Sequence, residues 1–480
     1  MLLFLCGIAV LIVGYFTYGK LVEKILAPDD RATPAVKNPD GVDYIELPHW
    51  KNMLIQLLNI AGIGPVIGVI LGIKFGSIVF ILLPIGNLIA GATHDMIAGM
   101  MSLRSGGANL TSLVKTNLGK TYYNIFSWFM VILLLLVVAV FVNIPANLIS
   151  GMIPGEWFWN AVVAITIYYV AAALFPVDKI IGAIYPFFGA LLVLSTLAIF
   201  VMLLWEGFKD PTLLQESEAF RNNMFTAEKN QPILPMLFVT IACGIISGFH
   251  ATQSPIVART MKTERQARST FYGMMVSEGI IGMIWAGAGL AIYNLFPEYM
   301  NIVPAKVLSY ITSHFLGSVA GKITIIGVVV LAITSGDTAL RSTRMALGEM
   351  LRIDQKPIRN RLLLCGIMLI VVVALLWWSN QSAKTFNLLW NYFSWGNQIL
   401  AVTTLMAGSV YLLKQGKNCL ITLIPGAFML FIVACYILWI SPSHGGPLGF
   451  GLPLNTAYIL SLVIVAVSIL AIWKRGRSSK

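Results

Sequence analysis

The sequence predicts an all-α integral membrane protein with about 13 transmembrane helices. Of its 480 residues, 58% are hydrophobic and only 11% are charged, which is too little charge to cover the surface of a soluble protein of this size. A bilayer crossing takes roughly 20 apolar residues, so about 13 crossings need about 260 residues, which this chain can supply. Runs too apolar for a water-exposed helix lie at 131–142, 191–204, 323–333 and 458–473.

The individual spans follow from these apolar runs and their flanks. The first is interpreted as a retained helix, because no basic residue precedes it and no small-residue cleavage pattern closes it. In residue numbers, the spans are predicted at 2–19, 53–73, 77–101, 124–145, 158–176, 180–205, 233–253, 270–295, 321–339, 362–378, 387–412, 418–440 and 455–473.

Lys and Arg are distributed unevenly over the loops between these spans. The loops on one side carry only seven of the 32 basic residues, and the other 25 lie on the opposite side or at its helix ends. Cytoplasmic loops collect Lys and Arg, so we expect the N-terminus outside and the C-terminus in the cytoplasm. The net charge of +12 then indicates orientation in the plasma (inner) membrane of a bacterium or archaeon, and not nucleic-acid binding.

Cysteine usage predicts neither a metal centre nor a disulfide framework. The five cysteines are scattered, mostly in apolar runs, without CxxC or Cys/His spacing. They are interpreted as small apolar residues. No cofactor is expected.

Two of the predicted spans are interrupted by Gly and Pro. The second contains the sequence AGIGPVIG at 61–68, and the seventh contains ISGFHATQSP at 246–255. Gly weakens a helix and Pro removes a backbone donor, so each span is predicted to break there, although a plain Pro kink is an alternative. Broken backbone is tolerated in a membrane only against protein or a water-filled cavity, where it can hold an ion or a solute.

The spacing of the two breaks suggests an inverted repeat. A unit of five helices that starts at the second span ends before the seventh, and because five is odd the second unit is inverted in the membrane. The predicted segments are 1–52 with the first helix and a cytoplasmic loop, 53–205 as repeat 1, 206–232 as an extracytoplasmic loop, 233–412 as repeat 2, and 413–480 with two further helices and a basic tail.

The ninth span carries oxygen-bearing side chains in its cytoplasmic half. Thr334, Ser335 and Asp337 offer the hard oxygens that Na⁺ prefers, and Asp337 could instead carry a proton. Arg341 lies one turn further on, within reach of an ion pair. An Asp–Arg pair that only fixes the helix end is the alternative.

Other polar residues in the spans are weaker candidates. His250 suits proton exchange or a hydrogen bond to a carboxylate, and a structural histidine is the alternative. Helix packing is slightly favoured for Asn397 and Gln398. Glu278, deep in the eighth span, and Asp95, at the cytoplasmic end of the third, are candidate proton carriers, although a capping role near the membrane surface is favoured for Asp95.

These motifs resemble the carbon starvation protein A (CstA) family of membrane transporters, in its short form. The matching stretches are DGVDY at 40–44, AGIGPVIG at 61–68, GGANL at 106–110, ACGIISGFHATQSP at 242–255, SEGI at 277–280, Asp337 with Arg341 and Arg344, and GNQ at 396–398. The resemblance implies a LeuT-like core of five plus five helices, of the amino acid–polyamine–cation superfamily, and an association with pyruvate or peptide uptake during carbon starvation.

The resemblance also implies roles for the residues at the breaks. Ala61, Thr334, Ser335 and Asp337 would surround the coupling ion. The substrate-binding residues would be Gly62, Gly64, Pro65, Ser247, Gly248, His250, Thr252 and Gln253. Glu278, Arg341, Asn397 and Gln398 are secondary candidates.

The predicted function is therefore a symporter, driven by H⁺ or Na⁺, for pyruvate or a related carboxylate, with peptides or amino acids as the next choice. No P-loop is present, so an ion gradient is expected to supply the energy. A membrane nutrient sensor is one alternative, but the chain has no evident output domain. A membrane-embedded enzyme is another, and the lack of HExxH and GxSxG motifs argues against it. The expected partners are the solute and the lipid bilayer, and the oligomeric state is left open.

Overall fold

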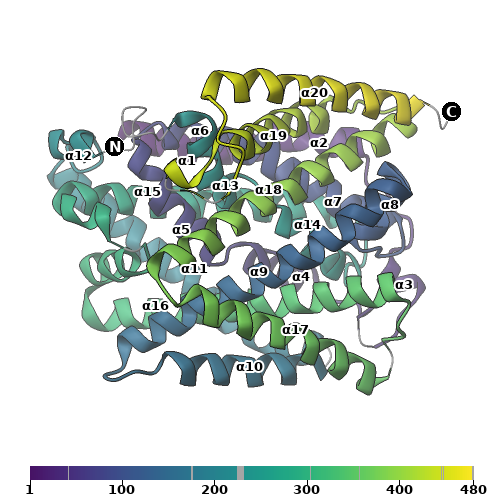
Figure 1. Ribbon diagram of the computed structural model, residues 1–480, viewed down its shortest axis with the longest axis horizontal. Coiled ribbons are helices and arrows are strands. Elements are labelled where there is room, and N and C mark those ends of the chain that lie inside the picture. The colour runs from purple at the N-terminus through teal and green to yellow at the C-terminus, as the bar shows by residue number, and fades with distance from the viewer. Residues whose placement is uncertain are drawn as a thin grey trace.

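The protein is built of helices throughout the part of the chain that the structure describes (Figure 1). The computed structural model covers residues 1–480, of which 42, 175–176, 224–231, 303, 356, 445, 447 and 478–480 lie outside the description. At 173–186, 383–384 and 387 only the backbone is described. The prediction of an all-α protein is therefore confirmed for the described residues.

Eleven helical segments in this part of the chain are long and apolar enough to cross a membrane. Each contains one or two α-helices, and three also contain π- or 3₁₀-helical turns. They are α1 and α2 (Leu2–Phe16 and Tyr18–Leu26), α6 to α7 (Val79–Gly86 and Ala92–Arg104), α9 (Lys120–Met152), the 187–209 part of α11 (Val177–Lys209), α13 and α14 (Phe238–Ile245 and Gly248–Ala258), the segment Glu264–Leu295 that ends in α15 (Met274–Leu295), α16 (Pro304–Leu351), α17 (Ile358–Ser379), α18 (Ala383–Lys414), α19 (Leu420–Trp439) and α20 (Leu454–Arg477).

Two further helical units account for the remaining predicted spans. Helices α4 (His49–Ile60) and α5 (Ile63–Gly72) form a pair bent by 48°, which raises the number of crossings to twelve if the pair is one span. Helix α10 (Phe158–Leu174) is apolar, but it is shorter than the other spans. Each of the 13 predicted spans thus overlaps a helix. A count of 13 crossings depends on α10 and stays a prediction.

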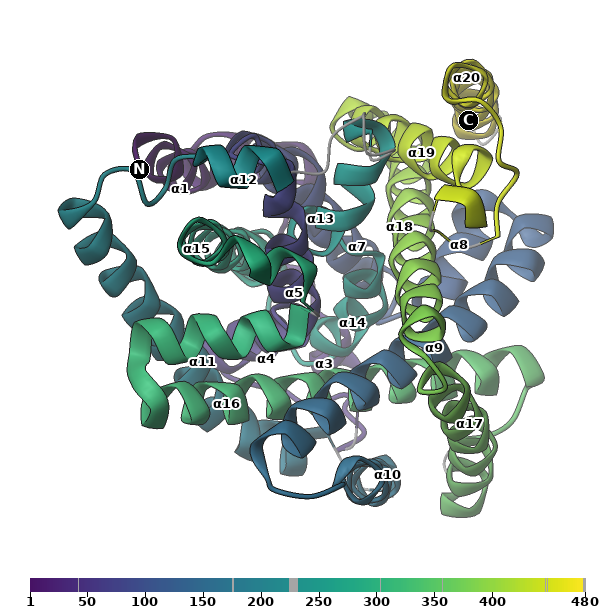
Figure 2. The ribbon, with the colours of Figure 1, turned by 60° about the vertical axis from the view of Figure 1, so that its left-hand side comes forward.

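The degree of burial separates central helices from peripheral ones. In α15 and the turns before it, 89% of the most apolar stretch is buried, whereas in α20 the corresponding share is 17%. Figure 2 shows α15 nearly end-on between α1, α5, α11 and α16, and α20 at the edge of the molecule. Exposed Leu and Val side chains on α20, such as Leu462 and Val467, are suited to contact with lipid. Polar residues that sit on α15 are consequently remote from lipid.

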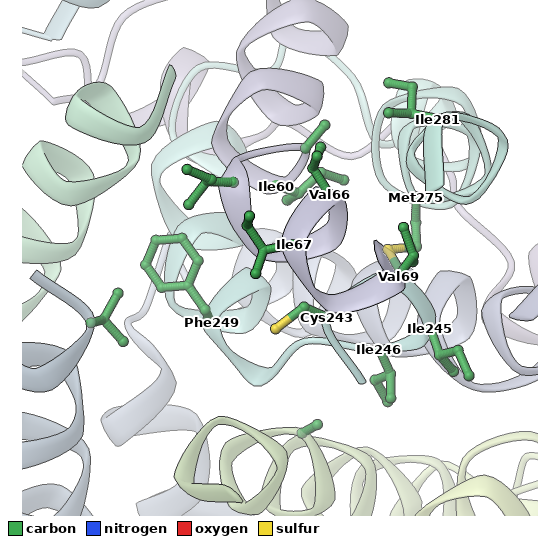
Figure 3. Packing of buried hydrophobic residues seen from close by; sticks show 14 of the residues in the cluster. Ile60, Val66, Ile67, Val69, Cys243, Ile245, Ile246, Phe249, Met275 and Ile281 are labelled. Atoms are coloured by element: carbon green, nitrogen blue, oxygen red, sulfur yellow. The ribbon is translucent and has the colours of Figure 1, made fainter. Parts of the chain in front are cut away.

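The two broken spans pack against each other in the interior. Helix α5 lies along α13, and α4 lies against α14. Gly64, Gly68 and Gly72 permit the first of these contacts, since a Cβ on Gly72 would lie 1.9 Å from Cγ2 of Ile241. Figure 3 shows the seam, with Val66, Ile67 and Val69 of α5 near Cys243, Ile245 and Ile246 at the second break.

Polar contacts divide the loops into two groups. These groups match the predicted alternation of loops between the two sides of the membrane. In one group, Arg104 at the end of α7 binds Glu264 and the carbonyl oxygen of Ala27, and Lys417 binds the carbonyl oxygen of Leu26. In the other group, Glu216 accepts hydrogen bonds from Ser77, Asn294 binds the carbonyl oxygen of Leu213, and His314 pairs with Glu206. In Figure 1 the two termini lie toward opposite ends of the long axis.

Candidate functional site

An amide side chain from α18 bridges the break in the second interrupted span. Residue Ser247 has an extended backbone before α14 begins. Oδ1 of Asn397 accepts a hydrogen bond of 2.8 Å from the backbone N–H of Phe249, and its Nδ2 donates one of 2.9 Å to Oγ of Ser247. The first N–H groups of a helix have no partner within the helix, so Asn397 supplies an acceptor that α14 itself lacks.

Gly248 lies where α14 touches the backbone of α18. A Cβ at this position would lie 2.2 Å from the carbonyl oxygen of Asn397 and 2.3 Å from the backbone nitrogen of Ala401. The neighbouring Gln398 donates a hydrogen bond of 3.2 Å to the carbonyl oxygen of Val239 on α13. Both amides, Asn397 and Gln398, thus join α18 to the second interrupted span, in keeping with the helix-packing interpretation.

The break in the first interrupted span lies beside α16. Ala61 and Gly62 leave the helical conformation between α4 and α5. A Cβ on Gly62 would lie 3.1 Å from Oγ of Ser335, and one on Gly64 would lie 3.4 Å from Cβ of Cys243. Pro65 occupies the first turn of α5, where its missing N–H removes no helical hydrogen bond. The structure therefore brings Gly62 and Ser335 together, as expected for a shared site.

Two buried oxygens of α16 lack hydrogen-bond partners among the described residues, Oγ of Ser335 and Oδ2 of Asp337. Thr334 is satisfied locally, because its hydroxyl donates to the carbonyl oxygen of Leu331 over 3.0 Å. Asp337 is 2% exposed, and the positive charges near it belong to Arg341 and Arg344. These unsatisfied oxygens are suited to an ion or a proton.

Arg341 extends from α16 toward the segment that connects α3 (Pro34–Lys37) with α4. Its Nη1 lies 3.7 Å from Oδ1 of Asp43, and its Nη2 donates to the carbonyl oxygen of Ala172 over 3.1 Å. The recorded ion pair of Arg341 is thus with Asp43 rather than with Asp337, so the arginine also ties a loop to the helix end.

A cavity of about 550 Å³ opens next to these residues, between α9, α10, α11 and α16. Thr334 and Tyr168 provide polar atoms at its wall, and most of the lining is apolar, including Ile165, Val330 and Ile333. Its volume is in the range of small-molecule sites. The cavity lies on the α16 side of the first break.

His250 belongs to a group of four buried titratable residues, which we call the histidine–carboxylate cluster: His94, Asp95, His250 and Glu278. Nδ1 of His250 lies 3.1 Å from Oδ2 of Asp95, and its Nε2 lies 3.8 Å from Oε2 of Glu278. Nδ1 of His94 lies 2.9 Å from Oδ1 of Asp95. None of the four is more than 1% exposed. The hydrogen bond to the Asp95 carboxylate is one of the two roles considered for His250, and proton exchange stays a prediction.

Thr252 and Gln253 contact α16 through Ser342, Thr252 by its backbone carbonyl oxygen and Gln253 by its side chain. Nε2 of Gln253 lies 2.9 Å from Oγ1 of Thr252 and 3.4 Å from Oγ of Ser342. Ser342 in turn donates to the carbonyl oxygen of Thr252 over 3.1 Å. The residues around the second break therefore divide between two neighbours, with His250 facing α7 and α15 while Thr252 and Gln253 face α16.

Sequence reasoning missed the contribution of α7 to the cluster. Asp95 was expected to cap a helix near the membrane surface, but its side chain is 0% exposed and binds two histidines instead. His94 was not considered at all. A His–Asp pair inside a predicted apolar span was the available signal, because ionisable groups within membranes are usually functional.

Among the described residues, no group of three or more His, Cys, Asp or Glu side chains has the arrangement of a metal site. The histidine–carboxylate cluster is joined by hydrogen bonds between both imidazoles and the Asp95 carboxylate. Its two imidazoles and two carboxylates can each gain or lose a proton.

The sequence pattern of the family described as carbon starvation protein CstA matches residues 1–163, 155–308 and 298–435. An uncharacterized membrane protein of Haemophilus influenzae is 39% identical over 342 residues, covering 61% of this chain and 92% of that protein. The peptide transporter CstA of Bacillus subtilis is 23% identical, with 88% of each chain covered. The pyruvate/proton symporter BtsT of Escherichia coli is 26% identical over 62% of this chain, which spans 50% of the symporter.

Solved transporters share the fold at low sequence identity. A manganese transporter of Eremococcus coleocola superimposes with a TM-score of 0.51 at 14% identity, covering 92% of this chain and 98% of the transporter. A Na⁺-coupled sialic acid symporter gives a TM-score of 0.52 at 14% identity, with 97% of each chain covered. The sequence relatives and the fold together support membrane transport.

Proposed function

Because the chain belongs to the carbon starvation protein CstA family, we propose that it is a secondary active symporter for a small organic solute. Pyruvate or a related carboxylate is the first choice, and peptides or amino acids are the second. Relatives of this chain handle both kinds of solute, since BtsT is a pyruvate/proton symporter and CstA of Bacillus subtilis is a peptide transporter.

The observation that carries this proposal is the contact between the two broken spans. Helices α5 and α13 lie side by side, and both breaks lie in the buried interior near the midpoint of their spans. Pairing α5 with α13 and α4 with α14 is the pattern that an inverted repeat of 53–205 and 233–412 would produce. Broken helices in contact inside a transporter are the usual place for a solute.

The proposed solute contacts are the backbone and small side chains at the breaks: Gly62, Gly64 and Pro65 in the first, and Ser247, Thr252 and Gln253 in the second. The proposed coupling-ion residues are Ala61, Thr334, Ser335 and Asp337. The unsatisfied oxygens of Ser335 and Asp337 support an ion at this position, and the closeness of Gly62 to Ser335 supports a location beside the first break. Gly248 is assigned to packing against α18.

The transport cycle would be alternating access, in which the broken helices hold solute and ion while the surrounding helices move around them. The N-terminus would lie outside and the C-terminus in the cytoplasm of a bacterial inner membrane. The contacts among the Lys- and Arg-rich loops support this orientation, because basic loops stay on the cytoplasmic side.

Reconstitution into proteoliposomes tests the proposal. Labelled pyruvate and a small panel of peptides would be offered under an imposed proton gradient and, separately, under an imposed sodium gradient. We expect one solute class to accumulate above its external concentration under one of the gradients. Collapse of that gradient by an ionophore should abolish accumulation. Equilibration without accumulation would indicate a channel, and binding without uptake would favour a sensor.

A further inference from the structure

The histidine–carboxylate cluster contains buried atoms that the protein leaves unsatisfied. Both carboxylate oxygens of Glu278 and Nε2 of His94 have no hydrogen-bond partner among the described residues. An ionised carboxylate without donors is costly to bury, whereas a protonated one is far less so. The cluster is thus built to change its protonation state and not to hold one fixed set of charges.

The number of charges in the cluster supports the same conclusion. His250 has a carboxylate near each of its ring nitrogens, Asp95 at Nδ1 and Glu278 at Nε2, which suits the imidazolium form with two N–H donors. With His250 charged, His94 neutral and both carboxylates ionised, the cluster carries one negative charge. One added proton on Glu278 makes it neutral, and neutrality is favoured at a site remote from water.

We infer that the histidine–carboxylate cluster is the proton-binding site of the transport cycle, with Glu278 as the group that gains and loses the proton. In one half of the cycle a proton from water on one side forms an O–H bond at the Glu278 carboxylate. In the other half this bond breaks and the proton leaves to water on the opposite side. This inference rests on the proposed function, and it adds a proton site to the ion site proposed at Ser335 and Asp337.

Helix α14 provides the link between this site and the solute. It carries His250, its first N–H groups are held by Asn397, and Thr252 and Gln253 attach it to Ser342 of α16. A shift of α14 on solute binding would change the distances from His250 to Asp95 and Glu278, which lie on other helices. Since these distances determine how strongly the imidazolium stabilises each carboxylate, solute and proton would influence each other's binding.

Other titratable and charged groups near the cluster come from the helices packed around it. Glu278 lies within electrostatic range of Cys243 on α13. Helix α16, which packs against α14, carries Asp337, Arg341 and Arg344, and the π-helical turn η6 (Arg268–Gly273), which packs against α7, carries Tyr272. Further titratable residues of the helices packed around the cluster include Lys20, Glu23, Lys24, His49, Lys51, Arg104, Lys115, Arg268, Lys306, His314, Lys322, Glu349 and Lys414.

Glu278→Gln in the full chain is the decisive variant, because it keeps the shape of the side chain and removes its proton exchange. With one proton per pyruvate, a gradient of one pH unit supports about tenfold accumulation. We expect this tenfold accumulation in the unmodified protein and none in Glu278→Gln. Exchange of labelled for unlabelled pyruvate, which needs no net proton movement, should remain within about threefold of the unmodified rate. Glu298→Gln, at an exposed glutamate, is the control and should accumulate normally.

A spectroscopic measurement tests the site without relying on transport. The carbonyl stretch of a protonated carboxylic acid should appear and disappear with pH in infrared difference spectra of the unmodified protein and of Glu298→Gln, and it should be missing in Glu278→Gln. If Glu278→Gln does not fold, Asp95→Asn replaces it, and the infrared band of Glu278 should then titrate at a changed pH.

The outcomes separate the inference from the proposed function. Proton-driven accumulation by Glu278→Gln at the unmodified level, or an unchanged infrared band, would overturn the inference alone. Loss of exchange together with accumulation in a folded Glu278→Gln protein would also overturn it, because the residue would then be needed for solute movement itself. Failure of the unmodified protein to move any solute under either gradient would overturn the proposed function.

Discussion

Glu264 and Glu278 belong to the same segment, Glu264–Leu295, and both are buried, yet their surroundings differ. Oε2 of Glu264 receives hydrogen bonds of 3.1 and 2.9 Å from Nε and Nη2 of Arg104, and Nε of Arg31 lies 3.4 Å from its Oε1. Glu278 has no hydrogen bond from any described residue and only His250 at 3.8 Å.

This difference separates a structural carboxylate from one that is available for chemistry. A carboxylate held by two guanidinium groups is fixed in its ionised form, and its loss would leave buried positive charge. A carboxylate without donors is stabilised when it takes up a proton. Burial alone therefore does not distinguish the two glutamates, whereas the number of hydrogen-bond donors around each one does.

Asp337 is a third buried carboxylate and provides the strongest test of this distinction. Its Oδ2 lacks a partner among the described residues, so it should resemble Glu278 and not Glu264. We expect Asp337→Asn to abolish concentrative uptake in proteoliposomes while the protein still inserts and folds in the membrane. Unchanged accumulation with a normal melting temperature would remove Asp337 from the coupling mechanism.

Glu264→Gln should affect stability instead of coupling. Removal of the carboxylate leaves Arg104, which is 7% exposed, without its charged partner, and breaking a buried pair costs about 3 kcal/mol. Thermal unfolding of the detergent-purified protein should therefore begin at a lower temperature, and the ratio of protons to solute moved should stay the same. A changed proton-to-solute ratio at normal stability would reverse the assignment of the two glutamates.

Asn397→Ala should have a smaller effect, located at the second break. The variant loses the hydrogen bonds to Phe249 and Ser247. A buried donor left without a partner lowers the free energy of unfolding by about 1–3 kcal/mol. We expect lower thermal stability together with weaker solute binding, because the start of α14 is no longer held. Gln398→Ala is the matched control, since its single bond to Val239 lies away from the break, and it should lower stability without changing solute affinity.

Asp30→Asn should have the smallest effect. Asp30 and Arg265 are both exposed, with 2.5 Å between Oδ1 and Nε, and the hydrogen bond from Arg265 lowers the pKa of the Asp30 carboxyl. A lowered pKa in the folded state stabilises the protein above the pKa of the unfolded chain, about 3.9, and this contribution is lost as the pH falls through the folded-state value. Because an exposed pair contributes little, the melting temperature at pH 7 should not change measurably. A clear decrease would show that loop contacts stabilise this face more than their exposure suggests.

The sequence was sufficient to locate the membrane helices and the two breaks. Apolar runs identify the spans, and Gly and Pro at 62, 64 and 65 identify the first break because of their backbone preferences. The span predicted at 321–339 ends too early: α16 leaves the helical conformation at Gly317, where φ is 77°, and its second part continues to Leu351. The polar and basic residues Asp337, Arg341 and Arg344 are buried against neighbouring helices, which hydropathy along one segment does not reveal.

The candidate site was predicted less completely, because its decisive contacts join distant parts of the chain. Asp95 and His250 are 155 residues apart, and Asn397 lies 148 residues from Phe249, whose N–H it accepts. The sequence identified His250 and Glu278 as separate candidates, but it contains no local signal that they meet. The role of Asn397 at the start of α14 likewise depends on the close approach that Gly248 allows.

The contact of Cys243 with Gly64 gives the protein a built-in chemical reporter. This thiol lies at the seam between α5 and α13 and is 5% exposed, so a water-borne maleimide can alkylate it only after the two broken spans separate. The rate of labelling at Cys243 would therefore count separations of α5 from α13, and protection of Cys243 by a solute would identify that solute without any measurement of uptake.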